Sequence, residues 1–172
     1  TPQLLSWGTS GGVGALGDGA ASTISAYIIS AASTPANIAF MFGGGYHYGA
    51  QGIGCVITTS GQLYCWGRGE GIGDGDATDE LSPKLTATGY TWKEIAVGSG
   101  LSNCGLTTDN LAYCWGRQDT NGLGNGVSNT TYAYAPQGPV GTSAFTWKQL
   151  AGGGYYDGSN HRQFVCGIRL TD

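Results

Sequence analysis

Cysteines are the residues of this chain whose spacing most directly predicts chemistry. Two pairs each lie ten residues apart, with a turn dipeptide midway: Cys55 and Cys65 across Ser60-Gly61, and Cys104 and Cys114 across Asp109-Asn110. Such dipeptides favour a tight turn between two strands. Opposed residues of a hairpin have Cα atoms about 4.5–5.5 Å apart, which a disulfide can span. We therefore predict two cross-strand disulfides. Buried free thiols or a metal site are the alternatives, but zinc sites prefer shorter cysteine spacings with histidine partners.

The fifth cysteine, Cys166, has no partner at the same spacing, because that position would fall beyond Asp172. We expect an unpaired or intermolecular thiol there. Persistent disulfides form in oxidising compartments. The cysteines therefore predict an extracellular or cell-surface location.

Two segments rich in glycine and tyrosine, at 43–54 and 152–165, are interpreted as enlarged loops. Tyrosine with asparagine, histidine and arginine on such loops is typical of contact surfaces for proteins or glycans. Packing between subunits would use the same side chains. The candidate binding residues are Tyr46, His47, Tyr48, Tyr155, Tyr156, Asp157, His161 and Arg162.

The remaining candidate chemistry is weak. Asp74, Asp76, Asp79 and Glu80 form an acidic cluster that could hold Ca²⁺, but the full calcium-loop pattern is absent, so we expect no metal and no cofactor. Asn129 begins an Asn-Thr-Thr glycosylation acceptor sequence. No nucleophile, base and acid lie in a supporting context, and no phosphate loop is present, so we predict that the chain is not an enzyme.

Composition favours an all-β protein. Glycine supplies 33 of 172 residues, and charged residues are 10% of the chain, against about 25% in a typical soluble domain. Glycine interleaved with β-branched and aromatic residues favours short strands joined by tight turns. The net charge is −4, and the seven basic residues are scattered singly, which argues against a nucleic-acid partner. No apolar run approaches the roughly 18 residues of a membrane helix.

Three sequence marks recur in the same order and define a repeat. The first is a Trp-Gly pair at Trp7, Trp66 and Trp115, each followed by a turn ending in Gly-Asp-Gly or Gly-Asn-Gly. The second is an aliphatic strand, Trp92 to Gly98 and Trp147 to Gly153, matched more loosely by Asn37 to Gly43. The third is a cysteine that opens a hairpin. Trp66 and Trp115 are 49 residues apart, which is the length of a propeller blade.

These marks together resemble the repeat of the regulator-of-chromosome-condensation family over essentially the whole chain. The resemblance implies a β-propeller of short antiparallel strands. We expect one domain over residues 1–172, with repeat units at about 8–66, 67–115 and 116–172. The family's nuclear role as an exchange factor for a small GTPase is not expected here, because the predicted disulfides indicate a secreted form.

The third repeat ends within its hairpin, and Leu4, Leu5, Ser6 and Trp7 match the strand that this hairpin lacks. Three blades are fewer than the four to eight or so that close a ring. The chain is therefore expected to be part of a larger propeller, to pair with a second copy in a six-bladed ring, or to form a filament. The predicted function is that of an extracellular structural or interaction protein. The alternatives are a lectin-like module and a protein inhibitor of an extracellular enzyme.

Overall fold

The computed structural model describes residues 4–9, 11–21, 24–30, 33–46, 51–98, 101–118, 121–126, 131–141, 145–156 and 161–171. Within these residues the chain is built from β-strands, turns and short 3₁₀ segments, and it has no α-helix. The strands are β1 (Leu5–Thr9), β2 (Ile24–Ser30), β3 (Ile38–Tyr46), β4 (Gln51–Thr58), β5 (Leu63–Gly67), β6 (Glu80–Thr86), β7 (Trp92–Val97), β8 (Ser102–Thr107), β9 (Ala112–Arg117), β10 (Tyr132–Gln137), β11 (Trp147–Tyr156) and β12 (His161–Arg169), and the 3₁₀ turn is Gly69–Gly71.

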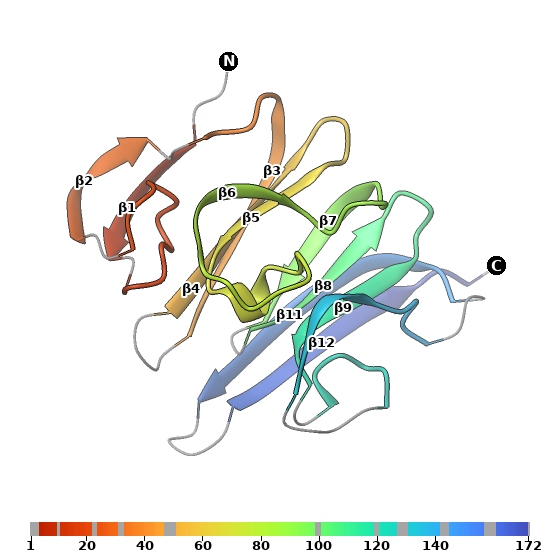
Figure 1. Cartoon of the computed structure of the whole chain (residues 1–172). Helices are drawn as coiled ribbons and strands as arrows, with labels where there is room; N and C mark the ends of the chain where they lie inside the picture. Colours follow the sequence, from red (N-terminus) through yellow and green to blue (C-terminus); the bar gives the residue numbers. More distant parts are fainter. Residues whose placement is uncertain are drawn as a thin grey trace.

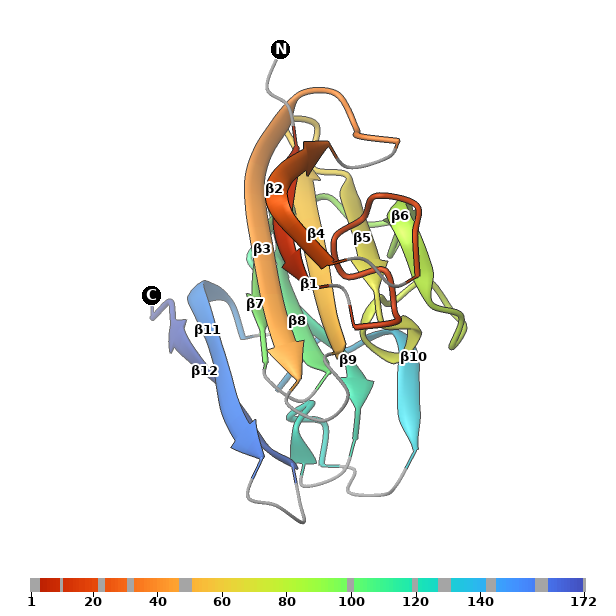
Figure 2. The same cartoon turned by 90° about the vertical axis from the view of Figure 1, so that its left-hand side faces the viewer.

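The strands form four antiparallel sheets, in agreement with the predicted all-β propeller architecture. Two sheets have four strands, in the orders β3-β4-β5-β6 and β7-β8-β9-β10, and each is one blade. The other two have two strands each, β1-β2 and β11-β12. The two four-stranded blades pack side by side, and the two-stranded sheets lie at opposite ends of the row (Figure 1). Figure 2 views the row from the end that carries β1 and β2.

The second and third strands of each full blade are joined by a pair of cysteines at disulfide distance, as the spacing predicts. Cys55 pairs with Cys65 in the β4–β5 register, with Cα atoms 4.1 Å apart. Cys104 pairs with Cys114 in the β8–β9 register, with Cα atoms 4.0 Å apart. The cysteines thus mark the same place in both blades.

The strand register corrects the sequence alignment of the first repeat by one residue. Ile38 pairs with Thr58, three residues after Cys55, and Trp92 pairs with Thr107, three residues after Cys104. Trp92 therefore corresponds to Ile38 and not to Asn37. Each of these first strands also has an irregularity directly after that position.

The segments interpreted as enlarged loops are mostly strands, so that prediction was wrong. The ladder between β3 and β4 continues to Tyr46 opposite Gln51, and that between β11 and β12 continues to Tyr156 opposite His161. The glycines of these strands allow neighbouring blades to pack closely. A Cβ on Gly44 would lie 2.3 Å from Cγ1 of Val97 in the next blade, so any larger residue would clash.

The core lies between successive blades. Nine buried residues form the cluster between the first and second blades, among them the Cys55–Cys65 pair, Trp92, Ile95 and Trp115. Trp92 and Trp115 contact each other with ring centroids 5.7 Å apart. Each indole N–H finds a backbone acceptor: Trp92 donates to the carbonyl of Ala87 and Trp115 to that of Gly71. A buried tryptophan therefore joins each blade to its neighbour without leaving its polar atom unsatisfied.

Candidate assembly site

The two-stranded sheets are complementary halves of one blade. In a full blade the third strand carries the Trp-Gly pair and the second carries the hairpin cysteine. Strand β1 carries Trp7-Gly8 and corresponds to β5 and β9, whereas β12 carries Cys166 and corresponds to β4 and β8. Among the described residues β1 pairs only with β2, and β12 pairs only with β11. Each half therefore presents one unpaired strand edge at the place where the other half would bind.

Trp7, on the open edge of β1, is far more exposed than the tryptophans at the same position of the two full blades. Its two counterparts, Trp66 and Trp115, are 4% and 0% exposed, whereas Trp7 is 67% exposed. The counterparts donate their indole N–H to the turn of the preceding repeat: Trp66 to the carbonyl of Ala15 at 3.0 Å and Trp115 to that of Gly71 at 2.9 Å. Trp7 therefore occupies the repeat position of a core tryptophan, but its side chain lies at the surface of this chain.

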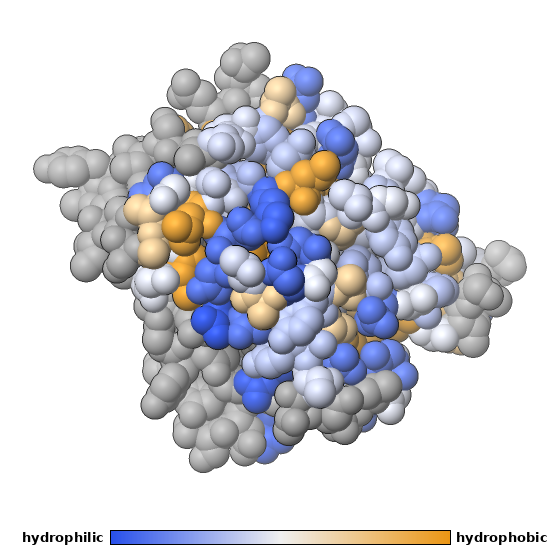
Figure 3. Space-filling model, in the orientation of Figure 1, coloured by the Kyte–Doolittle hydropathy of each residue, from blue (hydrophilic) through white to orange (hydrophobic). Residues whose placement is uncertain are grey.

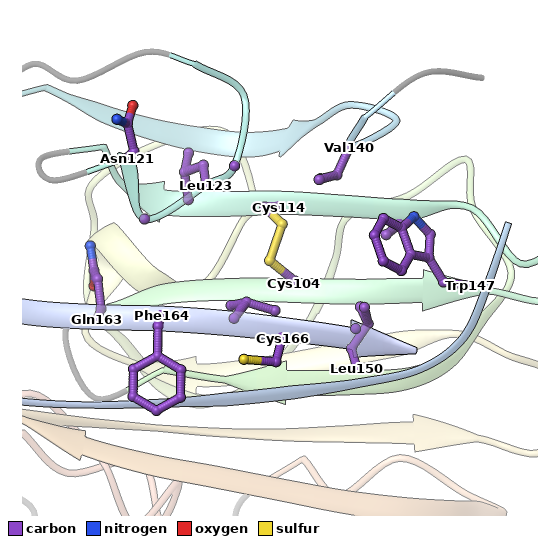
Figure 4. A pocket seen from close by; sticks show the side chains of 15 residues that line it. Cys104, Cys114, Asn121, Leu123, Val140, Trp147, Leu150, Gln163, Phe164 and Cys166 are labelled. Carbon is purple, nitrogen blue, oxygen red and sulfur yellow. A yellow bond between two sulfur atoms is a disulfide. The ribbon is translucent and has the colours of Figure 1, made fainter. Parts of the chain in front are cut away.

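A cavity of about 310 Å³ lies on the other open edge, beside β12 (Figure 4). Its lining comes from the Cys104–Cys114 pair, from the turn at 121–124 and from both strands of the last hairpin. These are the counterparts of the groups that surround Trp115. Leu123 corresponds to Ile72, Trp147 to Trp92, and Leu150 to Ile95. The cavity therefore lies where a tryptophan of the third strand would stand.

One polar side chain in this cavity has an unused acceptor. Gln163 is buried, and its Nε2 donates to the carbonyl of Arg117 at 3.2 Å. Its Oε1 is buried without a hydrogen-bond partner. A buried acceptor in this state is costly, and a donor entering the cavity would relieve that cost.

A second apolar hollow, beside β1, is the counterpart at the first end of the row. It is lined by Leu4 and Trp7, at and just before β1, and by Met41, Phe42 and other residues of the first blade. Met41 stands where Ile95 and Leu150 stand in the later blades. Ile95 and Leu150 are buried near the cysteine pair of the preceding blade, whereas Met41 is 64% exposed. Sequence reasoning missed Met41, because the position is recognised only after the register of the first repeat is corrected.

Apolar exposure is otherwise limited on the face shown in Figure 3, where hydrophobic residues form separate patches on a mostly hydrophilic surface. The exposed large apolar residues of the last hairpin are Tyr155, Phe164, Ile168 and Leu170. Phe164 and Ile168 belong to the open edge strand β12. Exposed apolar side chains on an unpaired strand favour strand addition by another chain.

Cys166 is exposed and forms no disulfide within the described part of the chain. It lies opposite Ala151 on β11. The corresponding position on β1 is Ser6, whose hydroxyl donates to the carbonyl of Leu16 at 2.7 Å.

The predicted tyrosine-rich binding residues are only partly placed by the structure. Tyr155 is 63% exposed and pairs in register with Arg162. Tyr46, Tyr156 and His161 have backbones in the long hairpins. His47, Tyr48 and Asp157 lie outside the described residues, as does the glycosylation candidate Asn129. Strands β3 and β11 both end on the same side of the molecule (Figure 1).

The acidic cluster is held by Lys84 and by backbone N–H groups. Lys84 Nζ lies 2.7 Å from Oδ2 of Asp74 and also contacts Glu80, and these hydrogen bonds raise the pKa of Lys84. Asp79 accepts a hydrogen bond from the backbone N–H of Gly69 at 2.9 Å. Asp76 accepts from the backbone N–H of Thr78, which lowers the pKa of Asp76. In the described part of the chain, no three potential metal ligands gather at one point.

The sheets of the described residues form an RCC1-like β-propeller fold, with two whole blades and two half-blades. No family model and no curated protein matches the sequence. Solved structures that are similar in fold include a yeast protein and a human protein. Yeast RCC1 (Prp20), from a crystal structure with Kap60 bound, has a TM-score of 0.68 and 17% identity, and the match covers 98% of this chain. Human WBSCR16 has a TM-score of 0.68 and 18% identity over 95% of this chain.

The match covers 38% of the yeast chain and 42% of the human chain, so the present chain spans well under half of either neighbour. Identities at this level establish the fold alone. No helix in the described ranges is long and apolar enough to cross a membrane.

Proposed function

We propose that this chain is a non-catalytic extracellular interaction protein whose propeller is completed by strand pairing at its two open edges. The observation that carries the proposal is the complementarity of the two-stranded sheets. One supplies the first and second strands of a blade, and the other supplies the third and fourth. A lone chain would leave both edges, Trp7 and the cavity open to water.

Two further observations support the proposal. The cysteine pairs fit an oxidising compartment, because disulfides persist outside the cytosol. The similar yeast protein, RCC1 (Prp20), was crystallised with Kap60 bound, so a protein with this fold is known to form a complex with another protein.

Native mass spectrometry of the purified chain, together with light scattering, tests the proposal. We expect particles that contain two or more chains at micromolar concentration. A single population with the 17.6 kDa mass of one chain over that range would contradict self-assembly. Such a monomer would then favour completion by additional blades of a longer chain.

Carbohydrate binding is a second candidate, and Tyr155 is the observation that favours it. This ring is 63% exposed near the end of a hairpin, and arginine stands opposite it in the ladder. Exposed aromatic rings can stack on sugars and offer a hydroxyl for hydrogen bonding. A glycan array with wild-type protein and Tyr155→Ala tests this function. Binding that the substitution abolishes supports it, and an array without binding contradicts it.

A further inference from the structure

We infer that the cavity beside β12 is the binding site for strand β1 of a second copy, and that two copies close a six-bladed ring. The inference rests on the proposed self-assembly and adds the partner, the register and the residue that fills the cavity. In this register Trp7 of one copy enters the cavity of the other, and Ser6 lies opposite Cys166. The same contact forms twice, once at each end of the row.

The register follows from the two complete blades. Trp66 lies opposite Gly54 and Trp115 opposite Asn103, one residue before the cysteine in each second strand. The same offset in the composite blade places Trp7 opposite Val165. It also places Gly8 opposite Phe164, because Gly67 lies opposite Ile53 and Gly116 opposite Ser102.

The cavity has acceptors for the indole N–H of Trp7. In the complete blades this N–H binds the carbonyl of Ala15 or Gly71. The corresponding residue of the third repeat is Gly122, which lines the cavity. Gln163, whose Oε1 is buried without a hydrogen-bond partner, also lines the cavity. The second copy therefore brings both the ring that fills the space and an indole N–H for the carbonyl of Gly122.

Strand β1 already has the backbone shape that the composite blade requires. Gly67 and Gly116 have φ values of +101° and +100°, and Gly8 has +110°. A Cβ on Gly67 would lie 2.1 Å from the carbonyl oxygen of Gly52, and one on Gly116 would lie 1.7 Å from that of Leu101. A Cβ on Gly8 meets nothing within 4 Å. The glycine geometry is present, and the carbonyl that demands it would be supplied by Gln163 of the second copy.

Ring size follows from the number of blades. Each chain contributes two complete blades and two halves that amount to one more. Two copies of these residues together hold six blades, which falls within the usual range of about four to eight. The exposed Met41 then packs on the composite blade, as Ile95 and Leu150 pack on the complete ones.

An engineered disulfide tests the register directly. Ser6→Cys places a thiol opposite Cys166 of the second copy, in the geometry of the two natural pairs. After mild oxidation we expect at least about half of the Ser6→Cys protein to run as a covalent dimer on a non-reducing gel, and to return to monomer after reduction. Leu5→Cys is the matched control, because adjacent strand residues point to opposite faces and its thiol faces away from Cys166. The double variant Ser6→Cys with Cys166→Ser is the second control, and it should stay monomeric on the gel.

The outcomes separate this inference from the proposed function. Two-chain native mass with no Ser6→Cys cross-link, or with equal cross-linking of Leu5→Cys, would overturn the register while leaving self-assembly intact. A cross-linked ladder of trimers and larger species would overturn the closed pair. A native mass of one chain together with no cross-link would overturn both. A reducible dimer that requires both the Ser6→Cys substitution and the native Cys166 supports the inference.

Discussion

At the residue scale, three equivalent glycines share one backbone conformation but have different surroundings. Gly67 and Gly116 each face a carbonyl oxygen within their own blade, whereas Gly8 has the same backbone conformation with open space beside it. L-residues with side chains rarely adopt φ near +100°, so all three positions are strained by substitution. A backbone clash is added at Gly67 and Gly116.

Alanine substitutions measure this difference. We expect Gly116→Ala to lower the free energy of unfolding by about 3 kcal/mol or more, because its Cβ would collide with the carbonyl of Leu101. Gly8→Ala should cost only about 1–2 kcal/mol in the separate chain. Urea unfolding monitored by tryptophan fluorescence checks both values. Equal losses at the two positions, measured at a concentration where the chain is monomeric, would contradict this account.

Tyr113 makes the free energy of unfolding depend on pH in the alkaline range. Burial raises the pKa of its phenol, with further contributions from Tyr90 and Asp109. A group whose pKa is raised in the folded state adds stability that is complete below its unfolded pKa, about 10, and is lost as the pH rises through the folded value.

We therefore expect the free energy of unfolding to fall above about pH 10, and the fall to be smaller in Tyr113→Phe. Urea titrations from pH 8 to 11 measure it, and Tyr155→Phe is the control for an exposed tyrosine. A Cys166→Ser background prevents exchange between the free thiol and the disulfides at high pH. An identical slope in Tyr113→Phe and its parent would contradict the prediction.

At the element scale, each full blade has its second and third strands covalently joined. Closing a loop of about ten residues restricts the unfolded chain and stabilises the fold by roughly 2.5–3 kcal/mol in the chain-entropy model. The bridge lies at the centre of its strand pair, and its two cysteines are almost fully buried.

Replacing both Cys104 and Cys114 by alanine should therefore lower the free energy of unfolding by about 2–5 kcal/mol. The midpoint of guanidinium unfolding measures the change. Cys166→Ala is the control, because Cys166 is exposed and unpaired, and its effect should stay within about 0.5 kcal/mol. A double variant as stable as this control would show that the pair is not bonded in the protein.

The sequence was sufficient to predict the blades, but it did not predict that two of their glycine-rich segments form long hairpins. The cysteine and Trp-Gly spacings predicted the repeat, the cysteine pairs and an N-terminal strand that matches the third strand of a blade. The segments 43–54 and 152–165 were interpreted as loops, because glycine usually marks turns. In the structure glycine is needed there for close approach between blades, as at Gly44 against Val97. That requirement depends on a neighbour far along the chain, which local pattern does not reveal.

Parts of the assembly site were also beyond sequence reasoning. The sequence placed Ser6 in the strand that the last hairpin lacks, but the cavity arises from several separate segments that meet only in the folded chain. Met41 was concealed by the one-residue misalignment of the first repeat. That error arose because Ile38 stands where the later repeats have tryptophan, so the first repeat lacked the residue by which the strands were aligned.

At the scale of the whole molecule, folding and assembly are coupled if the native chain binds a second copy. Anything that binds only the folded state raises the melting temperature with its concentration. We expect the melting temperature of the wild-type chain to rise over a hundredfold increase in protein concentration. Trp7→Ala should remove most of that rise, because the side chain that fills the cavity is lost.

Calorimetry or circular dichroism at several concentrations measures the effect. Leu85→Ala is the matched control, because Leu85 is an exposed apolar residue on β6, away from the two open edges. Its melting temperature should keep the concentration dependence of the wild type. The same dependence in Trp7→Ala would show that Trp7 has no part in the contact between chains.

The placement of the cysteine pairs has a mechanical consequence. Both lie between the second and third strands of a blade, which is also the joint at which the composite blade would be divided between two chains. In the composite blade Ser6 would face Cys166, so no disulfide would form there. The joint between its second and third strands would be held by non-covalent contacts alone, unlike the same joint in the two full blades. A pulling force applied to such a ring would part it first at that joint, leaving both halves whole and ready to rejoin.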